Sequence, residues 1–472
     1  MSFIPVLLAT DVLIWLLVAA AAACCWYCMR HDHLAAPWAR VFRSPAAVGS
    51  TVVLAAYLLV GLADSVHFRP ALASKDPKAT AAYAVDVQSL LDVLLAHLRE
   101  RTEKTYSAPL ATRSFAKEQI ERADGKVERD FPRLRYGGAH LTDEGARAGD
   151  VAVKALAGLA AAAAIWVLAA VALRPLRRRS PGVPWGAALI ALAAILAVAG
   201  PAFWLSASYH VLGTDKVGQD VLYLALKSIR TSIVIGTVTT LVLLPLGVAL
   251  GIMAGYFKGW VDDAIQYLYT TLNSIPGVLL IAAAVLMMQV YIDTHAEMFP
   301  TAAQRADLRL LFLCIILGLT SWTGLARLLR GESLKLSELE YIQAAHAFGV
   351  SGVRVLSRHI LPNVAHIVII TLVLDFSGFV LTEAVLSYIG VGVDPSTTSF
   401  GTMINAARLE MAREPMVWWS LAAAFMFMLV LVLAANLLAD AVRDGFDPRV
   451  RIGATGHSPA GKGSDAIAGA VK

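Results

Sequence analysis

EYIQAAHAFGVS, residues 340–351, stands between two long apolar runs, residues 310–329 and 365–390. The stretch is too polar to cross lipid, and it is too regularly patterned to be a slack loop. It therefore predicts a short ordered element that lies outside the membrane and joins two membrane-spanning helices.

The pattern within this stretch predicts one short helix with a single apolar face. Ile342, Ala345 and Phe348, with Ala344 beside them, recur at helical spacing. Gly349 then supplies a backbone that can turn sharply. Such a helix is shaped to dock into a groove of another protein, although the pattern alone also suits a helix that lies on lipid.

The two neighbouring runs belong to a set of nine apolar windows. Of the 472 residues, 58% are hydrophobic and 16% are charged, whereas ordinary globular domains have roughly 25% charged residues. About 20 predominantly apolar residues are needed to cross a bilayer, and continuous runs favour helices over an outer-membrane barrel. We therefore predict an all-α integral membrane protein. The windows are residues 4–28, 48–65, 152–173, 185–205, 229–255, 271–292, 310–329, 365–390 and 418–439.

The arginine-rich run RPLRRR, residues 174–179, sets the expected orientation. Four arginines in a short loop indicate the cytoplasmic side. Counting spans from this loop places residues 340–351 in the cytoplasm, and it places residues 66–151 and Met1 outside. A cleaved signal over residues 1–24 is the alternative, but the missing basic residue before the first span and the overlong apolar run argue against it.

Residues 66–151 are rich in charges of both signs, unlike the rest of the chain. Val87, Leu91, Leu94 and Leu98 recur at helical spacing and predict one amphipathic helix. We expect a small, mostly helical extracytoplasmic domain, with a partly disordered spacer as the alternative.

Several features of the sequence argue against a metal site, catalysis or a nucleic-acid partner. Cys25 and Cys28 lack a second pair of ligands, so no metal site is expected. No Ser/His/Asp or paired-carboxylate arrangement can be assembled, so no catalysis is expected. The net charge of +5 is small for this length, which argues against a nucleic-acid partner.

Three glycines and two carboxylates in the apolar windows are candidate functional positions. Gly247, Gly251 and Gly255 repeat every four residues, which lets helix backbones approach closely. Asp375 and Glu383 lie in or near the eighth window, where a carboxylate is costly and faces a cavity or a partner. Asp375 is a candidate for lining a transport pathway or for bonding a neighbouring helix, and Glu383 for the pathway or a structural pairing.

Residues 340–351 resemble the EAA loop of permease subunits of ABC importers, and the flanking sequence is similar to the dipeptide/oligopeptide (nickel) permeases. Matching motifs follow in order over residues 206–452. They are LGTD at 212–215, GQDVL at 218–222, RTS at 230–232, GYFKGWVD at 255–262, SIP at 274–276, EAVLSYIGVGV at 383–393, SFG at 399–401, NLLAD at 436–440 and RDGFDPR at 443–449.

The resemblance implies a permease of the bacterial inner membrane that forms one half of a translocation pathway. It implies a second permease subunit, two ATP-binding subunits and an extracytoplasmic substrate-binding protein as partners, besides the lipid bilayer. ATP and magnesium would bind to the partner ATPase, and no cofactor to this chain. Contact with that ATPase is implied for Gln343, Ala344, Ala345, Phe348, Gly349, Ser351 and Arg358.

The sequence departs from the family pattern at two positions. Gln343 stands where the family usually has a glutamate, and Gln219 replaces the arginine of a Gly-Arg-Asp triplet. A charge contact at Gln343 is therefore not implied by the resemblance, whereas the docking shape of the helix is. The relatives also have one span before the LGTD motif, whereas this chain has about four and an extracytoplasmic segment.

Two rival functions are considered. The first is an ion-coupled secondary transporter, for which no two-half symmetry is visible. The second is a membrane sensor, which leaves the pattern of residues 322–363 unexplained.

The sequence observations divide the chain into five parts. The five parts are N-terminal spans (1–65), the extracytoplasmic domain (66–151), an additional pair of spans (152–205), the permease core (206–452) with its coupling loop (330–364), and a disordered cytoplasmic tail (453–472).

Overall fold

A computed structural model describes residues 3–71, 83–121, 127–299 and 301–446 of the protein. Nine helices within these ranges are long and apolar enough to cross a membrane, which confirms the predicted all-α membrane fold and the number of spans. These helices are α1 (Ala9–Met29), α3 (Pro45–Asp64), α6 (Arg147–Ala172), α8 (Trp185–Ser206), α9 (Val221–Phe257), α11 (Gly277–Thr294), α12 (Ala302–Ser337), α15 (Leu361–Ile389) and α17 (Trp419–Phe446).

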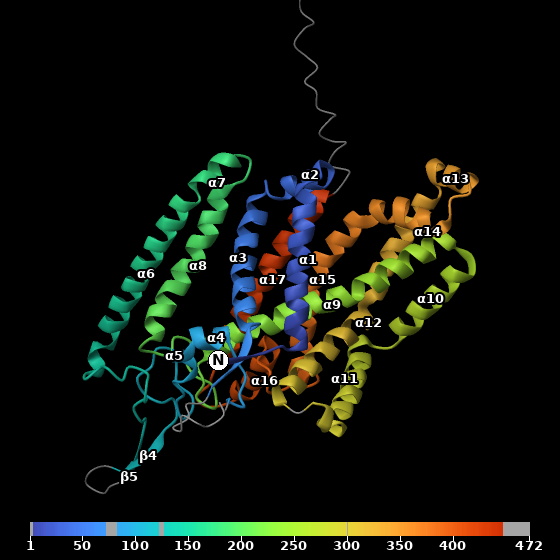
Figure 1. Ribbon diagram of the computed structural model, residues 1–472. Coiled ribbons are helices and arrows are strands. Elements are labelled where there is room, and N and C mark those ends of the chain that lie inside the picture. The colour runs from blue at the N-terminus through green and yellow to red at the C-terminus, as the bar shows by residue number, and fades with distance from the viewer. Residues whose placement is uncertain (1–2, 72–82, 122–126, 300, 447–472) are drawn as a thin grey trace, which may run out of the picture.

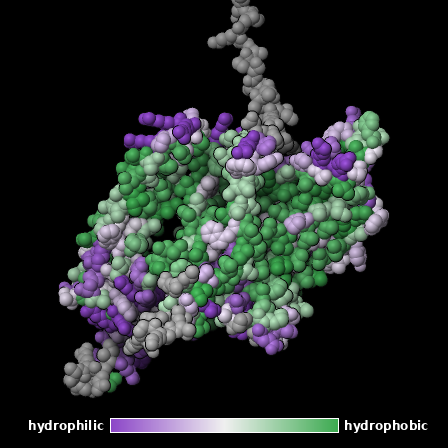
Figure 2. All heavy atoms as spheres, viewed as in Figure 1, coloured by the Kyte–Doolittle hydropathy of each residue, from purple (hydrophilic) through white to green (hydrophobic). Residues whose placement is uncertain are grey.

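The shorter elements gather at the two ends of the bundle. Helices α2 (Asp32–Val41), α7 (Arg174–Arg179) and α13 (Glu340–Ala347) lie at one end, and α16 (Phe400–Glu410) lies at the other with the described residues between 66 and 146 (Figure 1). The arginine-rich run and the EAA-like stretch are thus at the same end, as the alternation of spans requires. We call it the cytoplasmic end. Between the ends, the surface is predominantly hydrophobic (Figure 2), as a lipid-facing surface must be.

Helix α9 is the longest element and runs obliquely through the bundle (Figure 1). Its 37 residues span about 55 Å at a rise of 1.5 Å per residue, which exceeds the roughly 30 Å of hydrocarbon. Asp220 caps its first turn by accepting a hydrogen bond from the Leu222 N–H at 2.8 Å. With this cap the helix begins at Val221, eight residues before the predicted window starts.

The glycine stripe on α9 packs against α12 of the same chain. A Cβ on Gly247 would lie 2.9 Å from the Leu325 side chain, and one on Gly251 would lie 2.7 Å from the Ala326 carbonyl oxygen. A Cβ on Gly255 would lie 2.6 Å from the Arg330 carbonyl oxygen. Only glycine therefore permits this separation of the two backbones, which supports the packing role predicted for the stripe and identifies its partner.

The sixth span begins later than predicted because a proline separates two helices. The sequence window starts at residue 271, but α10 (Gly259–Ser274) ends first and α11 begins at Gly277. Ile275 between them is extended, with φ −91° and ψ 130°, as a residue before proline prefers.

The extracytoplasmic segment is not mostly helical, and that prediction is wrong. The helices among its described residues before α6 are α4 (Leu90–Leu94), α5 (Ala96–Arg99) and the 3₁₀ turn η1 (Glu144–Ala146). Strand β2 (His67–Pro70) pairs antiparallel with both β1 (Phe3–Val6) and β3 (Gln88–Ser89), and β4 (Glu118–Glu121) pairs with β5 (Val127–Asp130). We call residues 66–146 the insertion.

The physical reason is that the insertion bonds to a distant loop. The Glu103 N–H donates to the Gly218 carbonyl oxygen at 2.9 Å, and the Leu110 N–H donates to that of His210 at 2.9 Å. These partners lie about a hundred residues away in sequence, and residues 101–117 form turns, bends and loop in place of a helix. A local helical pattern cannot reveal such contacts.

The remaining short elements follow α11 and α13. They are the 3₁₀ turn η2 (Ala296–Met298), α14 (Gly352–Val355) and the π-helical turn η3 (Leu356–Ile360). The predicted tail, residues 453–472, and the last six residues of the predicted core lie outside the described residues.

We expect Gly251→Ala to destabilise the protein. The added methyl group would lie 2.7 Å from the Ala326 carbonyl oxygen, and relieving such a clash costs about 1–3 kcal/mol. The midpoint of SDS-induced unfolding should fall. Gly324→Ala is the matched control, because a Cβ there meets no atom within 4 Å. Equal midpoints for the two variants would contradict the close packing of α9 on α12.

Candidate functional site

Helix α13 forms at the predicted place and ends in a glycine turn. It covers Glu340–Ala347, and Gly349 follows with φ +75°. The Gly349 N–H donates to the His346 carbonyl oxygen at 2.9 Å, and the Val350 N–H donates to that of Ala345 at 3.0 Å. This pair of bonds is the Schellman motif, whose left-handed residue favours glycine. The predicted turn at Gly349 is therefore confirmed.

The single apolar face predicted for this helix is wrong, because two of its members point to different surroundings. The Ile342 side chain is completely buried in the core, whereas Phe348 is 87% exposed. Ala345 is half-buried and Ala344 is exposed. Phe348 is the C-cap residue, where the chain leaves the helix, so helical spacing no longer decides where its side chain points. The helix is thus anchored by Ile342 and presents Phe348 outward.

Two neighbouring spans hold α13 in place. The Tyr256 hydroxyl at the end of α9 lies 2.8 Å from His346 Nε2, and the two rings stack with centroids 5.4 Å apart. On the other side, Asn363 Nδ2 of α15 donates to the Tyr341 hydroxyl at 3.1 Å. A movement of α9 or α15 would therefore act directly on α13.

An ion pair between α10 and α12 supports the same end of the bundle. The Arg330 guanidinium donates to both carboxylate oxygens of Asp262, each at 2.6 Å. Such a two-pronged contact fixes orientation as well as distance. Lys258 and Glu338 form a second, exposed ion pair next to α13.

The other residues predicted to contact an ATPase are solvent-accessible. Gln343 is exposed and donates from Nε2 to the Glu338 carbonyl oxygen at 3.2 Å. Ser351 is exposed at the N-terminus of α14, and Arg358 is exposed within η3. The structure thus gathers these residues with Phe348 and Gly349 over three consecutive short elements.

The two candidate pathway carboxylates lie in different surroundings on α15. Glu383 is buried, and its Oε1 accepts from the hydroxyls of Ser387 at 2.6 Å and Ser399 at 2.8 Å. Asp375 is half-buried and forms no hydrogen bond or ion pair with any described residue. These placements favour a structural pairing for Glu383 and leave Asp375 as the unpaired carboxylate of the two.

A buried cluster of charges at the extracytoplasmic ends of the helices escaped the sequence analysis. Arg230 Nη2 of α9 donates to Asp11 Oδ1 at 2.6 Å and to Thr10 Oγ1 at 2.8 Å, both on α1. Asp307 of α12 accepts from the Thr10 N–H at 3.1 Å, and His67 Nδ1 lies 2.7 Å from Asp11 Oδ2. A charge inside an apolar window is the signal that could have found this cluster, because Asp11 and Arg230 each interrupt one.

A second group of contacts extends the cluster into the insertion. Lys227 Nζ of α9 donates to Asp92 Oδ1 at 2.6 Å and lies 3.6 Å from Asp64 Oδ1 of α3. The Ser89 hydroxyl donates to Asp64 at 2.6 Å, and the Tyr223 hydroxyl donates to Asp92 at 2.7 Å. Charged side chains of α9 thus connect the N-terminal spans, the insertion and the rest of the bundle.

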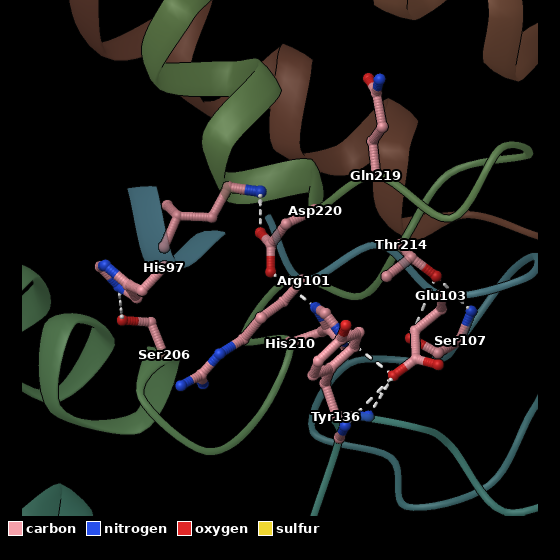
Figure 3. A network of polar contacts seen from close by, with 12 residues as sticks. His97, Arg101, Glu103, Ser107, Tyr136, Ser206, His210, Thr214, Gln219 and Asp220 are labelled. Atoms are coloured by element: carbon pink, nitrogen blue, oxygen red, sulfur yellow. Dashed lines mark hydrogen bonds and ion pairs between the residues drawn. The ribbon is translucent and has the colours of Figure 1, made fainter. Parts of the chain in front are cut away.

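The insertion is also attached to the loop that precedes α9, through a buried histidine (Figure 3). His210 Nδ1 lies 2.8 Å from Asp220 Oδ2, and its Nε2 lies 3.4 Å from Glu103 Oε1. Glu103 accepts further hydrogen bonds from three backbone N–H groups of the insertion, those of Arg135 at 2.9 Å, Tyr136 at 2.8 Å and Gly137 at 3.2 Å.

The electrostatics of this network favour a charged histidine between two carboxylates. Burial disfavours the imidazolium, but the hydrogen bonds to Asp220 and Glu103 outweigh burial and raise the pKa of His210 to about 9. Burial likewise opposes ionisation of Glu103, but the hydrogen bonds from His210 and the backbone N–H groups lower its pKa to about 2. His210 and Glu103 therefore carry opposite charges that stabilise each other.

Two further contacts complete this attachment. The Thr214 hydroxyl accepts from the Ser107 N–H at 2.7 Å, and His97 Nε2 lies 3.0 Å from the Ser206 hydroxyl (Figure 3). Gln219, which replaces the family arginine, points away from His210 in the same view. Its backbone N–H donates to Asp215 Oδ1 at 2.8 Å, so the turn forms without the arginine side chain.

Residues 247–452 match the family model described as "Binding-protein-dependent transport system inner membrane component". The oligopeptide transport system permease protein OppC of Mycobacterium tuberculosis is 32% identical to the chain over 242 residues, which cover 51% of this chain and 77% of that protein. The chain belongs to this family. The resemblance to dipeptide and oligopeptide permeases is thereby confirmed, and the chain is a multi-pass membrane permease subunit of an ABC importer.

Two other relatives match a similar share of this chain. The glutathione transport system permease protein GsiD of Pectobacterium atrosepticum is 32% identical over 52% of this chain and 74% of that protein. The dipeptide transport system permease protein DppC of Lactococcus lactis is 30% identical over 51% of this chain and 64% of that protein. Among solved structures, a chain of the inward-facing MetNI methionine ABC transporter covers 48% of this chain at 14% identity, with a TM-score of 0.35.

The family model covers α13 and the glycine stripe, whereas α1–α8 and the insertion precede it. The ionic contacts of Arg230, Lys227 and His210 therefore attach this additional half of the chain to the extracytoplasmic end of the permease core.

We expect the attachment of the insertion to depend on pH. Because the pKa of His210 is raised from 6.5 to about 9, its stabilising contribution is complete below about pH 6.5 and is lost as the pH rises through 9. Because the pKa of Glu103 is lowered from 4.5 to about 2, its contribution is complete above about pH 4.5. Hydrogen–deuterium exchange of residues 103–110, corrected for the intrinsic pH dependence, should therefore accelerate between pH 7 and pH 10.

His210→Gln removes the titrating group, so it should abolish this acceleration between pH 7 and pH 10. His295→Gln is the matched control, because His295 lies on the loop between α11 and α12, and it should behave like the unaltered protein. A His210→Gln protein with an unchanged pH profile would exclude His210 as the group that titrates.

Proposed function

We propose that this chain is one of two permease subunits of an ATP-driven importer of dipeptides or oligopeptides in the bacterial inner membrane. Its α13 would contact a separate ATPase, and an extracytoplasmic binding protein would deliver the substrate. ATP and magnesium would bind to the ATPase subunits. The observation that carries the proposal is the exposed Phe348 beside a glycine turn on a helix that is itself firmly anchored.

The contacts of α13 support a role in transmitting movement. Ile342 is buried, and the His346 ring stacks on the ring of Tyr256 at the end of α9. A movement imposed on Phe348 would therefore be passed to α9 through these packed side chains. The hydrogen bond from Asn363 to the Tyr341 hydroxyl connects α13 to α15 in the same way. Aromatic side chains, phenylalanine among them, are enriched in the buried centres of protein interfaces.

The surface of α15 supports a place near the translocation pathway. Leu374, Leu381 and Val385 are exposed, and Asp375 lies on the same helix without a partner among the described residues. A carboxylate at membrane depth is costly unless it meets water or a partner. We infer that this part of α15 faces the second permease subunit or the aqueous pathway between the two.

The substrate class rests on the relatives. Two of the three permeases described above are named for oligopeptide or dipeptide transport, and the third is named for glutathione, itself a small peptide. We therefore propose peptides as the imported molecules.

We expect Phe348→Ala to weaken binding of the ATPase while the permease stays folded. The side chain is 87% exposed, so its loss removes little from the core, whereas truncating a central interface aromatic weakens binding by about tenfold or more. Phe425→Ala is the matched control, because Phe425 is an exposed phenylalanine of α17. Co-purification of the co-encoded ATPase measures the effect.

Two stronger substitutions test the same helix. Gly349→Pro forces φ near −65° where the turn needs +75°, and Ala345→Asp places a carboxylate on the half-buried side of α13. Both variants should insert normally and fail to couple. Normal co-purification and uptake with either one would exclude α13 as the coupling element.

Transport itself is tested in vesicles that contain the permeases and the ATPase, with the binding protein and a labelled peptide. Uptake should require ATP. Uptake driven by a proton or sodium gradient without ATP would instead identify a secondary transporter, and the absence of genes for an ATPase and a binding protein nearby would favour a sensor.

A further inference from the structure

The cytoplasmic end of the hairpin formed by α6 and α8 contains a hollow lined by arginines. Its volume is about 490 Å³. Three of the four arginines of α7 line it, together with two residues of the loop before α8 and the first two residues of α8. The lining residues are Arg174, Arg177, Arg178, Pro181, Val183, Trp185 and Gly186. We call this feature the basic hollow.

The charges of the basic hollow are not neutralised within the described part of the chain. None of the side chains of Arg174, Arg177 and Arg178 forms a hydrogen bond or an ion pair with a described residue, and no carboxylate lines the hollow. Arg43, from the loop before α3, lies next to it, because its Nε is 3.9 Å from the position of a Cβ on Gly182. Guanidinium groups that gather without an acidic partner repel one another unless an anion joins them.

The position of the basic hollow indicates what kind of anion fits. Figure 2 shows hydrophilic residues at the tip of this hairpin directly above a hydrophobic wall. The two helices of the hairpin have exposed apolar side chains, such as Leu168 of α6, which is 69% exposed, and Ile190 of α8, which is 72% exposed. Trp185 marks the boundary between the hydrophilic tip and the hydrophobic wall, with its Nε1 donating to the Ser180 carbonyl oxygen at 3.2 Å, and tryptophan is enriched at the membrane interface.

We propose that the basic hollow binds the headgroup of an anionic phospholipid from the cytoplasmic leaflet. The guanidinium groups of Arg174, Arg177 and Arg178 donate hydrogen bonds to the phosphate oxygens, a geometry for which arginine is well suited. The acyl chains lie along the hydrophobic wall of α6 and α8. Basic pockets between helices on this side of a membrane are suited to anionic headgroups.

The lipid has a structural consequence for the bundle. Helix α6 packs on α8, where Gly158 and Gly200 approach so closely that a Cβ on either would lie 2.6 Å from the carbonyl oxygen of the other. Helix α8 in turn packs on α3. A lipid held at the tip would therefore tie this hairpin, and with it the N-terminal half, to one leaflet.

Arginines in a short loop also orient the neighbouring spans. The experiment must therefore distinguish lipid binding in the hollow from the effect of the positive charge alone. The purified full-length protein is prepared with dioleoylphosphatidylglycerol or with dioleoylphosphatidylcholine, and bound lipid is counted by native mass spectrometry. The unaltered protein should retain one phosphatidylglycerol and no phosphatidylcholine. Simultaneous Arg174→Gln, Arg177→Gln and Arg178→Gln should weaken retention by about 100-fold, since each basic side chain near a membrane contributes about fivefold.

Two single substitutions make the test specific. Gly186→Trp keeps every charge and fills the hollow, where a Cβ meets no atom within 4 Å, so it should abolish retention. Arg179→Gln removes a charge of α7 that does not line the hollow, so retention should persist. Because Gly186→Trp removes no arginine, it remains informative even if the triple variant inserts incorrectly.

Three results would overturn the proposal. Undiminished retention in Gly186→Trp would mean that the hollow is not the site. An equal loss of lipid retention in Arg179→Gln and in the triple variant would mean that retention depends on the total charge of α7 and not on the hollow. Displacement of the lipid by inorganic phosphate at an equal concentration would identify a site for free phosphate.

Discussion

The close approach of α9 to α12 is the contact on which the rest of the structure depends. Gly247, Gly251 and Gly255 bring the two backbones so near that no Cβ fits between them. Helix α12 continues through a short turn into α13, and α9 reaches the same helix through Tyr256 and His346. The glycine stripe therefore sets the position of α13, the helix that presents Phe348 to solvent. In a membrane, where apolar side chains gain little by leaving lipid, such close packing is what holds helices together.

At the opposite end of α9, charges replace glycines as the means of attachment. Arg230 and Lys227 connect α9 to α1, α3, α12 and the insertion. A buried pair of this kind is weak evidence for added stability, because desolvation offsets attraction, but removing one partner leaves an uncompensated charge. These contacts therefore specify how the additional N-terminal half is oriented on the core. His210 performs the same task for the insertion, with Glu103 and Asp220 on either side.

The spans were predictable because lipid imposes a simple rule on sequence. A crossing segment must be apolar over about 20 residues and helical throughout, so the nine windows coincide with nine helices of the described chain. The turn at Gly349 was predictable because a left-handed residue favours glycine. The sixth span was misplaced by six residues, since the break at Pro276 interrupts a run that composition alone joins. Phe348 was assigned to the wrong face because it lies at the helix end, where the backbone leaves the helical path.

The sequence by itself determined the membrane fold, the family and the existence of an exposed short helix, because these depend on composition and on order along the chain. Only the tertiary structure decided the form of the insertion, the partner of the glycine stripe and the charge cluster around Arg230. Those features join residues that are far apart in sequence, such as Asp11 with Arg230 and Glu103 with His210. No periodicity within one segment records them, because each partner is supplied by a different helix or loop.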